Sequence, residues 1–206
     1  MADTSAGQER KVVTILFADV IGSTALGEQL DPERLRSLLG AYFAAMASII
    51  ESWGGTVEKY IGDAIFAVWG LPDASDDDAA NALRCANGMI AALDGWNAER
   101  SAAGERILAI GIGLHHGPAV IGDVGSERSL SFTVIGDTVN TASRLQALTR
   151  SLATPLVVSD ELVAALRPRA TDTLSTMLDG LQDRGEQILR GRSGAVRVWV
   201  RPEPTR

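Results

Sequence analysis

The sequence contains a single cysteine, Cys85, and this scarcity excludes two kinds of site. One thiol cannot form an internal disulfide bond or a cysteine-rich metal centre. Cys85 lies in the segment ALRCANGMI, which has helical character, so we expect a buried structural thiol. These features are typical of a protein in the reducing environment of the cytoplasm.

Long apolar runs are also missing from the sequence. No stretch approaches the roughly 18 apolar residues of a membrane-spanning helix. The N-terminal residues MADTSAGQER lack the apolar core of a secretory signal. We therefore expect no membrane segment in this chain, and we place any anchor, sensor or regulatory domain outside it.

Positive charge is scarce, since 19 lysines and arginines face 26 aspartates and glutamates and give a formal net charge of −7. This balance argues against non-specific binding to nucleic acid or to an anionic membrane, because both require a basic surface. A protein of this charge that binds a polyphosphate needs a local group of cations or a metal ion.

The chain has enough apolar material for a core, because 46% of its 206 residues are hydrophobic. No internal repeat or low-complexity linker divides it. We expect residues 1–10 to be a flexible N-terminal segment and residues 11–206 to form one domain.

The first part of the sequence alternates strand and helix patterns. KVVTILFADV predicts a buried strand, TVEKY and AIFAVWG predict a hairpin around IGD, and PDASDDD begins a long helix. The run Asp76–Asp78 favours a solvated helix start over a calcium site, because acidic residues stabilise a helix N-terminus. RILAIGIGLHHGPAVIGDVG predicts two further strands joined near Gly117-Pro118.

A long helix follows Asp31, which can cap it, while Gly54-Gly55 ends it. Its apolar side chains recur at helical spacing, so they form one stripe, which we interpret as core. The stripe consists of Leu35, Leu38, Leu39, Tyr42, Phe43, Met46, Ile49 and Ile50.

The order strand, helix, strand, strand, helix, strand predicts an α+β fold with a ferredoxin-like β-α-β-β-α-β core. In that core an antiparallel sheet carries both helices on one face. GDTVNTASRLQAL predicts an additional helix, PLVVSDELVAAL a strand and a helix, and AVRVWV a final strand. These segments are C-terminal additions to the core.

The segment FADVIGSTAL places Asp19 at a strand end, directly before the small residues Gly22, Ser23 and Thr24. A surface turn would explain the pattern, since these residue types are common in turns. The predicted fold favours another explanation, because it brings Asp19 beside Asp63 of the hairpin. Two such carboxylates can hold divalent cations, and the amides around Gly22–Thr24 would then face phosphate groups.

Two adjacent histidines, His115 and His116, are weaker candidates for a metal site. Neighbouring residues of a strand point to opposite faces. The pair therefore makes a poor metal clamp.

Three segments together, FADVIGST, VEKYIGDAIFAVW and FTVIGDTVNTASRL, resemble the catalytic domain of class III nucleotide cyclases. The resemblance extends from about Val12 to Leu148, with a weaker similarity in GRSGAVRVWV. It implies an adenylate cyclase that converts ATP to 3′,5′-cyclic AMP and pyrophosphate for intracellular signalling. It also implies two Mg²⁺ or Mn²⁺ ions per active site and a homodimer with two shared sites.

The resemblance also implies roles for individual residues. Asp19 and Asp63 match the two metal-binding aspartates, and the backbone carbonyl of Ile21 matches a further metal contact. Lys59 and Thr133 match the positions that read the purine.

The remaining functional positions lie close together in the sequence. Asn140 and Arg144 match the pair that stabilises the transition state, and Arg128 matches an arginine that reaches the triphosphate. The spacing of four independently places Asn140 and Arg144 on one side of a helix. Without the resemblance, Arg144 pairing with Asp137 and a solvated Lys59 are equally good or better explanations.

Thr133 departs from the family pattern, because many members carry aspartate there. A carboxylate accepts the adenine amino proton and repels a guanine carbonyl, whereas a hydroxyl accepts and donates. Thr133 with Lys59 thus points to ATP with weaker base discrimination. Ser23 is a second departure, since that position is often aromatic. The general base stays open between Asp19 with its metal, solvent and substrate phosphate.

Two other functions remain as alternatives. A diguanylate cyclase requires a Gly-Gly-acidic-acidic-Phe-like hairpin, whereas this hairpin contains YIGDAIF. A non-enzymatic nucleotide sensor predicts loss of a metal aspartate or of the transition-state arginine, and both residues are retained.

Overall fold

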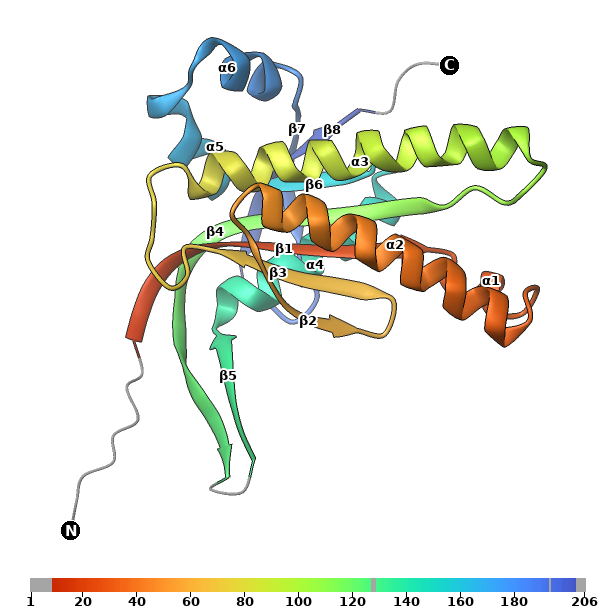
Figure 1. The fold of residues 1–206 in the computed structure, drawn as a ribbon. Coiled ribbons are helices and arrows are strands. Elements are labelled where there is room, and N and C mark those ends of the chain that lie inside the picture. Colours follow the sequence, from red (N-terminus) through yellow and green to blue (C-terminus); the bar gives the residue numbers. More distant parts are fainter. Residues whose placement is uncertain (1–8, 127–128, 193, 203–206) are drawn as a thin grey trace.

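The computed structural model describes residues 9–126, 129–192 and 194–202, and an eight-stranded sheet forms its centre (Figure 1). Seven strands follow one another across the sheet, and the eighth, β5, pairs with β4. Their order is β2 (Thr56–Ile61), β3 (Ala64–Trp69), β1 (Glu9–Ile21), β4 (Ala109–Ser126), β6 (Leu156–Ser159), β8 (Ala195–Arg201) and β7 (Gln182–Ile188), with β5 at Ser129–Ile135.

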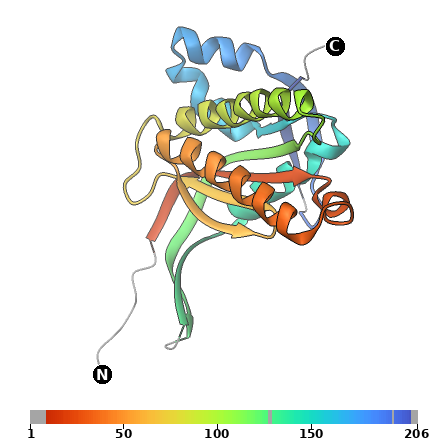
Figure 2. The ribbon, with the colours of Figure 1, turned by 45° about the vertical axis from the view of Figure 1, so that its right-hand side comes forward.

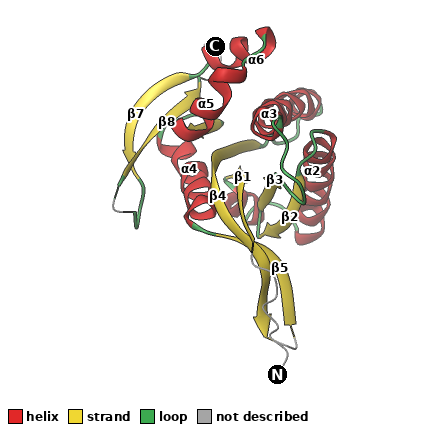
Figure 3. Ribbon diagram, turned by 90° about the vertical axis from the view of Figure 1, so that its left-hand side faces the viewer, coloured by secondary structure: helices red, strands yellow, loops and turns green. Residues whose placement is uncertain are grey.

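The predicted β-α-β-β-α-β core is confirmed. Strand β1 is antiparallel to both β3 and β4, and β2 is antiparallel to β3. Helices α2 (Pro32–Ser52) and α3 (Asp78–Ala102) lie on the same face of the sheet (Figure 3). The C-terminal additions join through β6, which is parallel to β4 and antiparallel to β8.

Helix α2 begins and ends where the sequence predicts. The Asp31 carboxylate accepts a hydrogen bond of 2.9 Å from the Arg34 N–H, and Gly54 adopts a φ of 73° just beyond the last turn. The apolar stripe is core. Four of its side chains are buried and the rest are partly buried against them.

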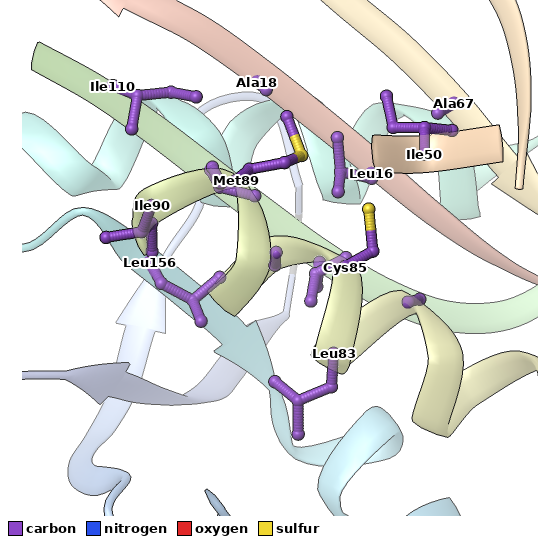
Figure 4. Packing of buried hydrophobic residues seen from close by; sticks show 14 of the residues in the cluster. Leu16, Ala18, Ile50, Ala67, Leu83, Cys85, Met89, Ile90, Ile110 and Leu156 are labelled. Carbon is purple, nitrogen blue, oxygen red and sulfur yellow. The ribbon is translucent and has the colours of Figure 1, made fainter. Parts of the chain in front are cut away.

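The hydrophobic core beneath α2 and α3 contains side chains from both helices and from the strands of the sheet (Figure 4). Leu16 and Ala18 of β1 belong to the same buried cluster as Ile50 of α2 and Met89 of α3. Cys85 is buried in the same cluster, as expected, and burial raises the pKa of its thiol to about 12. This cluster fixes one face of β1 and leaves the other for a different element.

Helix α4 (Asp137–Ser151) covers the opposite face of the sheet. It approaches β4 so closely that a Cβ atom on Gly113 would overlap the backbone of Ala142 and Gln146. A Cβ on Gly111 would overlap the Thr149 hydroxyl. The two glycines therefore set the distance between α4 and the sheet.

One sequence prediction about the strands is wrong. β4 runs unbroken from Ala109 to Ser126, whereas we expected two strands joined near Gly117-Pro118. In the described ladders, β4 pairs with β6 up to Leu114 and with β5 from Val120. One edge of β4 therefore has no strand partner at Pro118, where a residue without an N–H is tolerated.

Several elements have no counterpart in the sequence predictions. These are α1 (Ser23–Gly27), β5, the 3-10 turn η1 (Arg167–Arg169), α6 (Asp172–Asp179) and β7. The expected helix after β6 is α5 (Asp160–Leu166). Strand β7 escaped prediction because it is mostly polar and exposed, so it shows no apolar alternation.

The starts of β1 and α3 differ slightly from the sequence predictions. Residues 1–8 lie outside the described residues, but Glu9 and Arg10 already belong to β1. Asp78 is the first residue of α3, so the acidic run lies at a helix start. The Asp78 carboxylate accepts a hydrogen bond from the Ser75 N–H.

Strands β4 and β5 extend together as an arm beyond the helices (Figure 2). Within the described part of the chain, every helix is too short or too polar to cross a membrane.

We predict that Gly113→Ala lowers the free energy of unfolding by about 1–3 kcal/mol or more, because the added methyl group must push α4 away from β4. Gly95→Ala is the control. Gly95 lies in α3 with open space around its Cβ position, so alanine should stabilise the protein by up to about 1 kcal/mol. Urea denaturation of both variants measures the difference, and equal stabilities would refute the close-contact explanation.

Candidate functional site

Asp19 and Asp63 meet at one end of the β1–β3 ladder. Asp19 pairs with Ala64 in the antiparallel register, and Asp63 immediately precedes Ala64 in a two-residue hairpin turn. Gly62 forms the other half of that turn with a φ of 63°, a conformation that glycine adopts readily. The register therefore places the two carboxyl groups close enough that each affects the pKa of the other.

The environment shifts the pKa values of the two carboxyl groups in opposite directions. Burial and the charge of Asp63 raise the pKa of Asp19 to about 6, although Arg150 acts against this. Burial also acts to raise the pKa of Asp63, but hydrogen bonds from Ser23, from its own backbone and from Asp19 outweigh burial and lower it. The paired carboxylates thus repel each other, and a cation between them would relieve that repulsion.

Two residues of α4 contact Asp19 and were not identified from the sequence. The Arg150 guanidinium donates to the Asp19 carboxylate at 3.0 Å, and the Gln146 amide lies 3.5 Å from the same oxygen. The signal that could have found them is their spacing of four, which places both on one side of a helix. Because Arg150 is largely exposed, its ion pair is a weak and replaceable counter-charge.

Tyr42 lies near the same carboxylates from the other side of the sheet. Its side chain is fully buried, and its hydroxyl has no hydrogen-bond partner among the described residues. Burial raises the pKa of this hydroxyl, and the charges of Asp19 and Asp63 raise it further. Tyr42 is therefore both a core residue, as expected, and a neutral neighbour of the aspartate pair.

The donor set at this end of β1 fits a hard divalent cation. Asp19 and Asp63 provide carboxylate oxygens, and Ile21 ends the same strand with a backbone carbonyl. Magnesium and manganese prefer oxygen ligands and are commonly held by one or two carboxylates together with substrate phosphates. Among the described residues, no group of three or more histidine, cysteine or acidic side chains forms a complete protein-only metal site.

The histidine pair lies apart from the aspartates. His115 Nδ1 is 2.8 Å from the Ser159 hydroxyl, and His116 Nδ1 is 2.9 Å from the Thr14 hydroxyl. The two rings point to opposite faces of β4, as the sequence predicts, and each has its own structural partner.

The small residues after β1 form the start of a short helix, which we did not predict from the sequence. Gly22 is the N-cap residue with a φ of 79°, and Ser23 and Thr24 begin α1. A left-handed backbone at Gly22 turns the chain sharply, because this conformation costs glycine little. The turn brings the Ser23 hydroxyl close enough to Asp63 to lower the pKa of its carboxyl group.

The two predicted purine-reading residues are brought together across 74 positions of sequence. The Lys59 ammonium on β2 donates to the Thr133 hydroxyl on β5 at 3.1 Å. Lys59 also lies 3.4 Å from a carboxylate oxygen of Glu58. Lys59 is therefore held by two neighbours and is not a freely solvated strand lysine.

Asn140 and Arg144 lie on α4, but away from the aspartates of their own chain. Asn140 is exposed and Arg144 is half-buried. A helix rises 1.5 Å per residue, so Asn140 lies about 15 Å and Arg144 about 9 Å along α4 from Arg150. Asp137 pairs with Arg192 at 3.3 Å, and this removes the expected alternative partner of Arg144. Arg128 lies outside the described residues.

A cavity of about 700 Å³ opens between the ends of α3 and α4. Ile21 and Arg150 line it, whereas Asp63, Lys59 and Thr133 do not. This cavity therefore does not join the aspartate pair to Lys59 and Thr133 within one chain.

Comparison with known proteins agrees with this arrangement. The family model of the adenylate and guanylate cyclase catalytic domain matches residues 6–202. Adenylate cyclase 1 of Rhizobium meliloti (strain 1021) is 34% identical over 190 residues, which is 92% of this chain. The chain covers only 27% of the length of that relative.

Solved structures show the same fold over nearly the whole chain. The adenylyl cyclase CyaB from P. aeruginosa aligns with a TM-score of 0.82 at 27% identity, covering 97% of this chain and 98% of the other. The guanylyl cyclase Cya2 aligns with a TM-score of 0.77 at 30% identity, covering 96% of each chain. Since both kinds of cyclase share this fold, the fold by itself does not select the purine.

We predict that Asp19→Asn stabilises the protein in the absence of divalent cations. The pKa of Asp19 is raised from 3.8 to about 6, so its protonated form contributes stability fully below pH 3.8 and loses it as the pH rises through about 6. At pH 7.5 the variant should unfold about 2–4 °C above wild type, which is about 1 kcal/mol for a chain of this size. Near pH 3.5 this advantage should vanish.

Manganese should reverse the order of the two proteins. It should raise the unfolding temperature of wild type and leave Asp19→Asn unchanged, because ligand binding stabilises only a protein that retains the site. Asp73→Asn, in the exposed loop before α3, is the matched control and should follow wild type throughout. An Asp19→Asn protein that manganese stabilises as strongly as wild type would contradict the metal assignment.

Proposed function

The chain belongs to the family of adenylate and guanylate cyclase catalytic domains, and we propose that it converts ATP to 3′,5′-cyclic AMP and pyrophosphate. In this reaction the ribose 3′-oxygen bonds to the α-phosphorus, and the bond to the β-phosphate bridge breaks. The observation that carries the proposal is the convergence of Asp19 and Asp63 in a chain that also retains Lys59, Asn140 and Arg144. The product would serve intracellular signalling in the cytoplasm.

The aspartates and the Ile21 carbonyl would hold two Mg²⁺ or Mn²⁺ ions. Such ions lower the pKa of a bound hydroxyl and neutralise charge on a triphosphate. The chain itself supplies the geometry, because the β1–β3 register holds both carboxylates at one strand end. Ser23 would help to keep Asp63 ionised, since its hydroxyl lowers the pKa of that carboxyl group.

Lys59 and Thr133 would read the purine. The Lys59 ammonium can donate to adenine N1, and the Thr133 hydroxyl can accept from the adenine amino group. Their contact of 3.1 Å supports a joint role, because both can reach one edge of a base. Lysine at the first position favours adenine, since guanine carries a proton on N1.

Asn140 would position the ribose, and Arg144 would stabilise negative charge that builds on the reacting phosphate. Arginine suits the second role because its guanidinium is always charged and presents several N–H donors in one plane. Arg128 would contact the triphosphate as a further cation. A preorganised donor of this kind contributes roughly 3–4 kcal/mol to transition-state stabilisation.

The active site would form between two copies of the chain. In one chain, α4 directs Arg150 to Asp19, while Asn140 and Arg144 lie about 15 Å and 9 Å further along the helix. A two-fold axis would bring these residues from one copy to the aspartates of the other and create two equivalent sites. Exposed apolar side chains near the purine-reading residues, including Tyr60, Ile61 and Ile135, are consistent with such an interface.

We predict that the purified protein produces cyclic AMP from ATP in the presence of Mg²⁺ or Mn²⁺, identified by product mass. Asp63→Asn should lower kcat by about 10²–10³, because loss of a comparable electrostatic contact has that cost. Asp73→Asn should retain wild-type activity. Full activity of Asp63→Asn would refute the metal role, and absence of any cyclic nucleotide from wild type would refute the proposed reaction.

We predict that two inactive variants restore activity when mixed. Asp19→Ala and Arg144→Ala carry lesions on opposite halves of a shared site, so a mixed dimer has one doubly damaged site and one intact site. With random pairing, half of the dimers are mixed, and activity should recover to about a quarter of wild type. Recovery should increase with total protein concentration, because it requires association.

The control for this experiment is a mixture of Asp19→Ala with Asp63→Ala. Both lesions then fall on the same half of the shared site, so every site in the mixed dimer keeps one defect. This mixture should stay inactive at every ratio. If the first mixture also stays inactive after confirmed subunit exchange, the shared-site proposal is wrong.

A further inference from the structure

Glu58 lies beside the two purine-reading residues and has no role in the proposed reaction so far. Its carboxylate is 3.4 Å from the Lys59 ammonium, which in turn contacts Thr133. The Glu58 side chain is only 11% exposed, although β2 is the last strand at its edge of the sheet. A carboxylate in such a position is unusual, because exposed edges normally place charged groups in solvent.

A β-bulge in β2 explains why Glu58 and Lys59 lie on the same face. Val57 pairs with Ala67 and Lys59 with Phe66, so Glu58 is the extra residue of the bulge. Such a bulge interrupts the strict alternation of side chains along a strand.

The packing on each side of β2 agrees with this assignment. Val57 packs in the core beneath α2, and the ring of Tyr60 lies 4.9 Å from that of Phe43 on α2. The two residues between them, Glu58 and Lys59, are therefore both directed away from α2. Without the bulge, Glu58 would share a face with Tyr60.

We infer that Glu58 is a third purine-reading residue, which supplies the carboxylate that Thr133 lacks. This inference rests on the proposed function, since it concerns the base of the same nucleotide. The Glu58 carboxylate would accept a hydrogen bond from the exocyclic amino group of adenine. It would repel the carbonyl oxygen that guanine carries at the same place, because both groups are acceptors.

The three residues would recognise the base through different hydrogen-bonding roles. Lys59 donates, Glu58 accepts, and Thr133 can do either. The ammonium of Lys59 also offsets the charge of Glu58, which allows a carboxylate to remain in a largely buried position. Selection for adenine then depends on Glu58 as well as on Thr133.

The test compares kcat/KM for ATP and GTP in wild type and in Glu58→Gln. The glutamine amide keeps the shape of the side chain but can donate to the guanine carbonyl, so the ATP/GTP ratio should fall by about tenfold or more. Thr133→Asp in the Glu58→Gln background restores a carboxylate and should recover most of the ratio. Glu51→Gln, an exposed residue at the end of α2, is the matched control and should leave the ratio unchanged.

A purely structural role for Glu58 predicts a different result. If Glu58 only holds Lys59, Glu58→Gln should lower kcat/KM for ATP without raising kcat/KM for GTP, which would overturn the inference. If Glu58→Gln does not fold, Glu58→Ala replaces it. It removes the acceptor that repels the guanine carbonyl, so it should lower kcat/KM for ATP and still raise kcat/KM for GTP.

Measurements of nucleotide binding distinguish a failure of this inference from a failure of the proposed reaction. If wild type forms no cyclic nucleotide, the proposed function fails, and the dissociation constants of ribose-labelled fluorescent ATP and GTP then decide the role of Glu58. A fall of about tenfold in the ATP/GTP binding preference of Glu58→Gln supports it. An unchanged preference overturns it.

Discussion

The antiparallel pairing of β1 with β3 is the constraint from which the candidate site follows. The register that pairs Asp19 with Ala64 also places Asp63 against Asp19, so folding forces two carboxylates together. Burial, and after it the charge of Asp63, raises the pKa of Asp19. The core beneath α2 and α3 holds β1 in place against this repulsion. The repulsion is also what makes the strand end a favourable position for divalent cations.

Helix α4 carries residues for both halves of the proposed shared site. Glycines at 111 and 113 let it lie directly on β4, and from there its last turn reaches the aspartates through Gln146 and Arg150. Its first turns extend away from them. One rigid helix can therefore supply a counter-charge to its own chain and present Asn140 and Arg144 to another. This geometry explains why a single chain, although it contains every residue of the proposed site, would need a second copy to complete that site.

In the proposed reaction, base recognition would depend on contacts between distant segments of the sheet. The β4–β5 ladder positions Thr133, and the bulge in β2 positions Lys59 together with Glu58. The hydroxyl at Thr133 leaves the cluster with less negative charge than the family pattern would give it. The neighbouring carboxylate of Glu58 on the bulge would compensate for this within one chain. Both purine cyclases share the fold, so selection for the base rests on such local groups.

The sequence by itself determined the core fold, the helix ends at Asp31 and Gly54, and the convergence of Asp19 with Asp63. These follow from apolar periodicity, capping and the topology of a β-α-β-β-α-β unit, all of which are local or simple in pattern. Resemblance to the family added Lys59 and Thr133, which the structure joins by a hydrogen bond. Only the tertiary structure revealed the contacts of Arg150 and Glu58, the continuity of β4 and the exposed strand β7. Helix–sheet packing, a one-residue bulge and the partners available at a strand edge decide these features, and none of them leaves a periodic signal in the sequence.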